Sequence, residues 1–179
     1  MAVFDATALL HFLEPDAPAA IDPATNAPVT DAKARIDYLI HTLERQRETI
    51  IIPTPALSEV LVHADAAGPR YLAILNRHAC FRVAPFDQRA AVELAAMTRE
   101  ALNAGRMHIG TNATRATLKF DRQIIAIARA EGHTTIYSDD SDIAKLAAPL
   151  GLEVIPMHQL SLPPEEAQGS LDLEENESE

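Results

Sequence analysis

Short apolar runs alternate with longer segments that repeat apolar residues at helical spacing along this chain. The runs are rich in β-branched residues and break off at proline, glycine or polar residues, as strands do. They predict strands at Ala2–Phe4, Ile50–Ile52, Phe81–Ala84, Thr134–Tyr137 and Leu152–Ile155. Strands that alternate with helices are typical of an α/β domain with a mainly parallel sheet. The pattern therefore predicts a three-layer α/β/α sandwich.

The predicted helices fill the intervals between these strands. The first begins near Thr7, whose hydroxyl can cap it. The others are predicted at 31–47, 56–67, 70–76, 88–104, 120–131 and 143–150. The dipeptide Gly68-Pro69 is interpreted as a helix stop. With these boundaries, Glu59 lies near the start of its helix and Asp121 in the first turn of its own.

Three segments fall outside the regular pattern. Residues 14–30 contain four prolines and no helical period, which predicts a surface insertion. Residues 106–114 are predicted to form a loop. Residues 163–179 carry seven acidic residues and no Lys or Arg, which predicts a disordered acidic tail. Residues 1–160 are expected to form one domain.

The net charge of −11 argues at first against a nucleic-acid partner, because phosphates dominate such binding. Its distribution weakens that objection. Without the seven acids of the tail, 19 acidic residues face 15 basic ones, so the body of the chain can carry a local basic patch. Three basic residues around the predicted helix 120–131 are candidates for RNA contact: Arg115, Lys119 and Arg122. An ordinary solvated helix face is the alternative.

The remaining composition excludes several classes of protein. Cys80 is the single cysteine and the seven histidines are scattered, so no internal disulfide and no zinc-site spacing are predicted. No apolar run reaches the roughly 18 residues of a membrane span, and the start lacks the basic segment of a signal peptide. We expect a cytoplasmic protein with no membrane partner.

Four acidic residues stand beside four different apolar runs: Asp5, Glu59, Asp121 and Asp140. If the runs are parallel strands of one sheet, these acids meet at its carboxyl edge, where α/β folds bind ligands. Carboxylates crowded into one crevice repel one another, and a divalent cation offsets that repulsion. Each acid alone is equally well explained as a helix cap or dipole partner. The four together favour a metal site.

In order and spacing, these segments resemble the PIN-domain nucleases, and among them the VapC-type toxins of bacteria. The resemblance covers roughly Ala2 to Pro156 and is carried by four stretches. They are Val3-Phe-Asp-Ala-Thr7, Pro55-Ala-Leu-Ser-Glu-Val60, Lys119-Phe-Asp-Arg-Gln-Ile-Ile-Ala126 and Tyr137-Ser-Asp-Asp-Ser-Asp-Ile143. The chain departs from the family at Ala6, where many members have a hydroxyl residue, and Thr7 follows one place later.

The resemblance implies a metal-dependent endoribonuclease that uses Mg²⁺ or Mn²⁺ to hydrolyse single-stranded RNA. The metal-binding acids would be Asp5, Asp121, Asp140 and the additional Asp142, and Glu59 would position a water or act as its base. Thr7 and Ser138 would orient these carboxylates. The resemblance also implies a cognate antitoxin and a homodimer.

Two other functions compete with this interpretation. A PIN-like fold can serve as a non-catalytic RNA-binding or scaffold module, although such a module would have no reason to keep four mutually repelling acids. A phosphatase of the haloacid-dehalogenase type would need Asp-x-Asp after the first strand. Thr7 occupies the second acidic position, which argues against that phosphatase.

Overall fold

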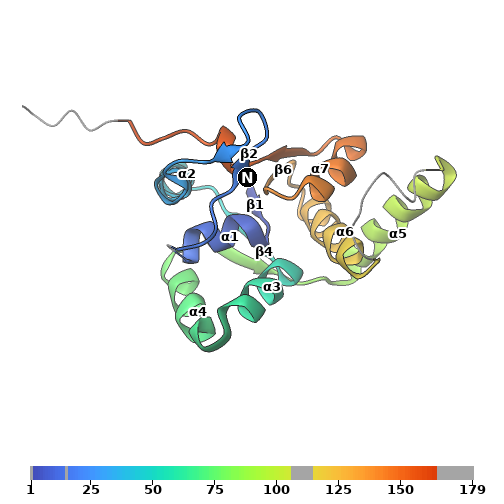
Figure 1. The fold of residues 1–179 in the computed structure, drawn as a ribbon. Coiled ribbons are helices and arrows are strands. Elements are labelled where there is room, and N and C mark those ends of the chain that lie inside the picture. Colours follow the sequence, from blue (N-terminus) through green and yellow to red (C-terminus); the bar gives the residue numbers. More distant parts are fainter. Residues whose placement is uncertain (1, 15, 106–114, 165–179) are drawn as a thin grey trace, which may run out of the picture.

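The computed structural model describes residues 2–14, 16–105 and 115–164. Its central sheet has five parallel strands in the order β5-β4-β1-β6-β7. These strands are β1 (Ala2–Phe4), β4 (Ile50–Pro53), β5 (Phe81–Ala84), β6 (Thr135–Tyr137) and β7 (Glu153–Ile155). Helices flank the sheet (Figure 1), and the predicted three-layer α/β/α class is confirmed.

The middle of the sheet is fully buried. Strand β1 pairs with β4 on one side and β6 on the other, and Val3 is aligned with both Ile51 and Ile136. All three side chains are inaccessible to solvent. A strand covered on both faces has no polar side, so its sequence is a continuous apolar run such as Ile50-Ile-Ile52.

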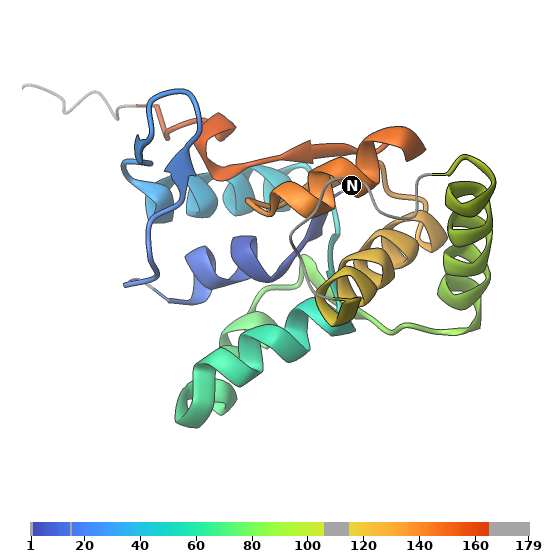
Figure 2. The same cartoon turned by 45° about the vertical axis from the view of Figure 1, so that its right-hand side comes forward.

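Seven α-helices pack around this sheet in the described part of the chain. They are α1 (Ala6–Leu13), α2 (Ala32–Arg45), α3 (Thr54–Ala64), α4 (Gly68–Arg77), α5 (Gln88–Asn103), α6 (Arg115–Ala130) and α7 (Ser141–Ala147). Helix α6 contacts α3, α5 and α7, and α5 lies on its outer side (Figure 2). None of the helices in the described ranges is long and apolar enough to cross a membrane.

Helices α3 and α6 begin earlier than the sequence predicted. Helix α6 begins at Arg115 rather than Phe120, because Arg, Ala and Leu in its first turn are good helix formers, although they precede the apolar repeat that predicted the helix. Helix α3 begins at Thr54 and accepts Pro55 in its first turn, where the missing N–H costs nothing. Asp121 and Glu59 therefore lie in second turns. Their predicted first-turn positions are wrong. The helix dipole favours acidic residues only within the first turn, so it does not explain either acid.

Two turn predictions also need correction. Gly68-Pro69 does not simply stop a helix, because α4 begins at Gly68 with the proline in its first turn. The 14–30 insertion contains a two-stranded hairpin of β2 (Ile21–Asp22) and β3 (Ala27–Pro28). The Asp22 carboxylate accepts a 2.8 Å bond from the Ala24 N–H and shapes its turn. Strands of two residues leave no periodicity to detect. Residues 106–114 and 165–179 lie outside the described residues.

The central strands should dominate stability. Replacing Ile51 by alanine removes three carbons from a fully buried site between two neighbouring strands. We expect this substitution to lower the free energy of unfolding by about 2–5 kcal/mol. The matched control is Val62→Ala on α3, a site that is 78% exposed, where we expect a change within about 0.5 kcal/mol. Urea denaturation measures both, and equal effects would contradict this description of the core.

Candidate metal centre

The carboxyl ends of β1 and β6 form the topological switch point of the sheet. From β1 the chain continues to β4 and β5 on one side, and from β6 it continues to β7 on the other. The crevice between two such strands is where open α/β sheets bind ligands. Asp5 follows β1, and Ser138 to Asp140 follow β6. The Asp5 N–H bonds the Tyr137 carbonyl at 3.2 Å, so the two segments lie side by side.

Asp5 is held by both of its carboxylate oxygens. It is 2% exposed, and its Oδ1 accepts hydrogen bonds from the Thr7 hydroxyl (2.8 Å) and the Ala8 N–H (3.0 Å). This oxygen caps α1, as the simpler interpretation of the sequence required. The other oxygen, Oδ2, accepts a 2.5 Å bond from the Ser138 hydroxyl across the crevice. Asp5 therefore joins the two strand ends, which a helix cap alone would not do.

The turn after β6 is built on the same two hydroxyls. Ser138 Oγ accepts the Asp140 N–H at 3.0 Å, and Thr7 Oγ1 accepts the Asp139 N–H at 2.9 Å. Asp140 in turn caps α7 through a 2.7 Å bond from the Asp142 N–H. These bonds fix the turn next to Asp5. The structure thus brings together five residues that the sequence singled out: Asp5, Thr7, Ser138, Asp140 and Asp142.

Asp121 approaches this group from α6. It is 5% exposed, and its buried Oδ2 accepts no hydrogen bond from any described residue. Burial and then the charges of Asp140, Asp142, Glu59 and Asp5 raise its pKa from 3.8 to about 7. All of the predicted acids therefore act on Asp121. A buried carboxylate oxygen without a partner is costly, and a cation would satisfy it.

The pKa of Asp5 is also raised, from 3.8 to about 6. Burial is the main cause, and the hydrogen bonds from Ser138, Ala8 and Thr7 oppose it. Two carboxyls with raised pKa values in one crevice are typical of functional sites.

The donor set fits a hard divalent cation. Asp5, Asp121, Asp140 and Asp142 offer only oxygen atoms, which Mg²⁺ and Mn²⁺ prefer. In the described part of the chain, ligand atoms of three acidic, His or Cys residues come within 4.8 Å of one another only at Glu44, His78 and Cys80, outside this crevice. Among the described residues, no three acids of the crevice bring their carboxylate oxygens that close together. Mg²⁺ keeps several waters and needs only one or two carboxylates, so it does not require closer convergence.

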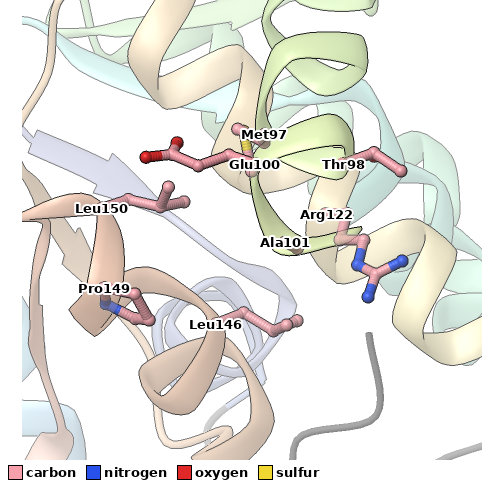
Figure 3. A pocket seen from close by; sticks show the side chains of 8 residues that line it. All are labelled: Met97, Thr98, Glu100, Ala101, Arg122, Leu146, Pro149 and Leu150. Carbon is pink, nitrogen blue, oxygen red and sulfur yellow. The ribbon is translucent and has the colours of Figure 1, made fainter. Parts of the chain in front are cut away.

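Two of the predicted RNA-binding residues, Lys119 and Arg122, lie on other faces of α6 than Asp121. Residues one and two places apart on a helix do not share a face, so Lys119 and Arg122 diverge from Asp121. Lys119 is exposed. Arg122 lines a cavity of about 40 Å³ between α5, α6 and α7 (Figure 3), too small for a nucleotide. The side chain of Arg115 lies outside the described residues. RNA contact at these three positions stays a prediction.

Sequence analysis missed a groove beside the crevice. It measures about 430 Å³, and its lining includes Thr7, Asp139, Pro18 and Ala20. Two of these residues come from the 14–30 insertion, which therefore borders the site. His11 also lines the groove, and its Nε2 lies 3.3 Å from Asp139 Oδ2. The sequence held one indication of this groove, because Thr7 and His11 are four residues apart and therefore share one face of α1.

Comparisons with solved structures bear on the fold of this chain. A chain of VapBC2 from Rickettsia felis, bound to a promoter DNA fragment, matches 87% of this chain and 97% of its own with a TM-score of 0.56 and 13% identity. A chain of DNA-bound VapBC from Salmonella typhimurium matches 87% of this chain and 97% of its own, with a TM-score of 0.54 and 14% identity. A chain of FitAB bound to a DNA fragment matches 90% of this chain and 98% of its own, with a TM-score of 0.58 and 18% identity.

The fold is a VapC-like PIN fold. No protein-family model matches the chain, and neither does any curated protein. At 13–18% identity, the likeness carries the fold and no residue roles. The case for a metal centre in this PIN fold therefore rests on the buried acids themselves.

The raised pKa of Asp121 predicts a pH-dependent stability in the presence of a chelator. The folded state keeps a proton that an ordinary aspartate loses near pH 3.8, so this contribution is fully present below that pH. It is lost as the pH rises to about 7. We therefore expect Asp121→Asn to gain stability relative to wild type between these values, as measured by urea denaturation at several pH values.

Asp37→Asn is the matched control for this prediction. Asp37 is exposed on α2, and its carboxylate accepts a hydrogen bond from Lys33, one turn earlier on the same helix. Its effect on stability should stay small from pH 5 to pH 8, given the usual worth of an exposed ion pair. A constant difference between Asp121→Asn and wild type over the same pH series would contradict the raised pKa.

Proposed function

We propose that this protein is a metal-dependent endoribonuclease that hydrolyses phosphodiester bonds of single-stranded RNA. We further propose that it is the toxin of a toxin–antitoxin pair. The observation that carries the nuclease is the buried Asp121 Oδ2, which accepts no hydrogen bond from the described residues while four other acids raise its pKa. Without a cation, the repulsion between these carboxylates would destabilise the folded protein and would not be compensated.

Each acid has a distinct part in the proposed chemistry. Asp5, Asp121 and Asp140 would hold Mg²⁺ or Mn²⁺, with Asp142 beside them. A bound cation would supply Lewis-acid polarisation of the phosphate and would lower the pKa of the attacking water. Hydrolysis adds the oxygen of this water to phosphorus and breaks the bond to the leaving oxygen.

Two further groups of residues support the reaction. Glu59 would accept the proton of the attacking water; its exposure on α3 and the effect of its charge on Asp121 support this role. Thr7 and Ser138 would act indirectly. Both donate hydrogen bonds to Asp5 and would thereby hold its carboxylate in the orientation that binds the cation. Lys119 and Arg122 would contact phosphates farther along the RNA rather than at the scissile bond.

The partners belong to the same proposal. The similar chains come from VapBC2, VapBC and FitAB assemblies on DNA, which supports a cognate antitoxin for this chain. The groove beside the crevice offers an apolar lining next to Thr7 and Asp139 and is a place for an antitoxin segment. The homodimer stays a prediction from the resemblance to VapC-type toxins.

A non-catalytic RNA-binding or scaffold module is the alternative. The buried acids argue against it, since RNA phosphates are repelled by uncompensated carboxylates. The two functions differ in a simple way. A nuclease shortens RNA only with the cation, whereas a binding module retains intact RNA.

Cleavage of a mixed pool of single-stranded RNA tests the nuclease. We expect products with Mn²⁺ and none with EDTA. Asp5→Asn and Asp121→Asn should each lower the rate by roughly 100-fold or more, because cation chemistry is worth several kcal/mol of transition-state stabilisation. Gel electrophoresis with product sequencing gives the rates and the cut sites.

Asp37→Asn is the control for the loss of a negative charge. This variant should cleave at the wild-type rate, because Asp37 lies on α2 and pairs with Lys33. Circular dichroism checks that each variant is folded. Intact RNA in every reaction, together with equal RNA binding in Mn²⁺ and EDTA, would replace the nuclease by the non-catalytic module.

A further inference from the structure

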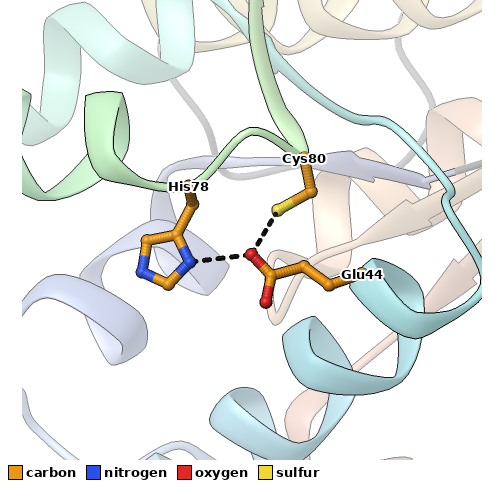
Figure 4. A group of neighbouring side chains, drawn as sticks. All are labelled: Glu44, His78 and Cys80. Carbon is orange, nitrogen blue, oxygen red and sulfur yellow. Dashed lines mark hydrogen bonds and ion pairs between the residues drawn. The ribbon is translucent and has the colours of Figure 1, made fainter.

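A second cluster of metal-ligand side chains lies at the amino-terminal edge of the sheet, at the opposite end of the strands from the acidic crevice. Glu44 belongs to the last turn of α2, His78 follows α4, and Cys80 directly precedes β5. Their ligand atoms lie within 4.8 Å of one another (Figure 4). Sequence spacing predicted no zinc site, because Glu44 is 34 residues from His78 along the chain.

The three side chains already converge on one point. Glu44 Oε1 accepts a 3.3 Å hydrogen bond from the Cys80 thiol and lies 2.9 Å from His78 Nδ1. An oxygen, a nitrogen and a sulfur are thus gathered around one point. A cation bound to the same three atoms would replace these two hydrogen bonds.

Neighbouring contacts hold the ligands in place. The His78 ring packs edge-on against Phe12 and Phe81, with ring centroids 5.5 and 5.7 Å apart. The Cys80 carbonyl accepts a 2.7 Å hydrogen bond from the Ile50 N–H, which ties the cysteine to β4. Ligands that are ordered before binding lose less entropy when the cation arrives.

An entry path leads to the cluster. A surface cavity of about 370 Å³ is lined by Glu44 and Cys80, and its other lining residues are Arg47, Glu48, Thr49 and Ala79. Solvent in this cavity can complete the coordination, and ligand identity together with an entry path are the features that a predicted metal site must show.

We propose that Glu44, His78 and Cys80 bind a thiophilic divalent transition-metal ion, for which Zn²⁺ is the biological candidate. Thiolate and imidazole select such an ion over Mg²⁺. On binding, the ion replaces the thiol proton, which passes to solvent. It also takes the place of the Nδ1 proton of His78, so the neutral imidazole changes tautomer through solvent and carries its one proton on Nε2. The bound ion would join the end of α2 to the start of β5. This site is independent of the proposed nuclease function.

Titration with Co²⁺ tests the proposal on the full-length protein after chelator treatment. We expect a saturable thiolate-to-cobalt charge-transfer absorption at one ion per chain, which Zn²⁺ displaces. Cys80→Ser should abolish this absorption and weaken Zn²⁺ binding by more than about 100-fold. Such a loss of affinity exceeds the one expected when a residue that only orients a metal ligand is removed. His78→Gln should weaken binding to a similar extent.

Two variants serve as controls. Asp121→Asn removes an acid of the other site and should keep the absorption, as should His63→Gln at an exposed position on α3. A wild type without the absorption would overturn the proposal. So would wild-type affinity in both His78→Gln and Glu44→Gln, because a lone thiol would then explain the binding. If Cys80→Ser does not fold, the affinity of folded His78→Gln decides the question.

Discussion

Repulsion among buried carboxylates is the constraint on which the rest of this structure depends. A parallel sheet sends the carboxyl ends of its strands to one edge, and here the chain reverses its winding between β1 and β6. Asp5 and Asp121 are buried at that edge, and burial raises the pKa of each. The crevice is stable at neutral pH only where something offsets this charge.

The fold offsets part of the charge and leaves the rest. Thr7, Ala8 and Ser138 donate hydrogen bonds to both oxygens of Asp5, which lowers the cost of its negative charge. Nothing comparable reaches Asp121 Oδ2 from the described residues. The hydroxyls thus fix one carboxylate as a rigid support, and the second carboxylate remains unsatisfied. This asymmetry supports the proposed cation site over a network of structural hydrogen bonds.

The sheet and its acids were largely predictable, because a fully buried strand such as Ile50-Ile-Ile52 has a continuous apolar sequence. Helix starts were not, since the segment Arg115-Ala-Thr-Leu-Lys119 at the start of α6 precedes the apolar repeat that begins at Phe120. Contacts between residues far apart in the sequence could not be predicted either. Periodicity cannot show that Ser138 bonds Asp5, or that Glu44 meets Cys80 from a segment 36 residues away.

Anomalous diffraction from crystals soaked in Mn²⁺ tests the central claim most directly, because it locates the cation without relying on activity. The account predicts an anomalous peak in contact with the Asp121 carboxylate, and loss of that peak in Asp121→Asn crystals. A crevice with no peak in wild-type crystals at saturating Mn²⁺, or a peak that survives in Asp121→Asn, would contradict it.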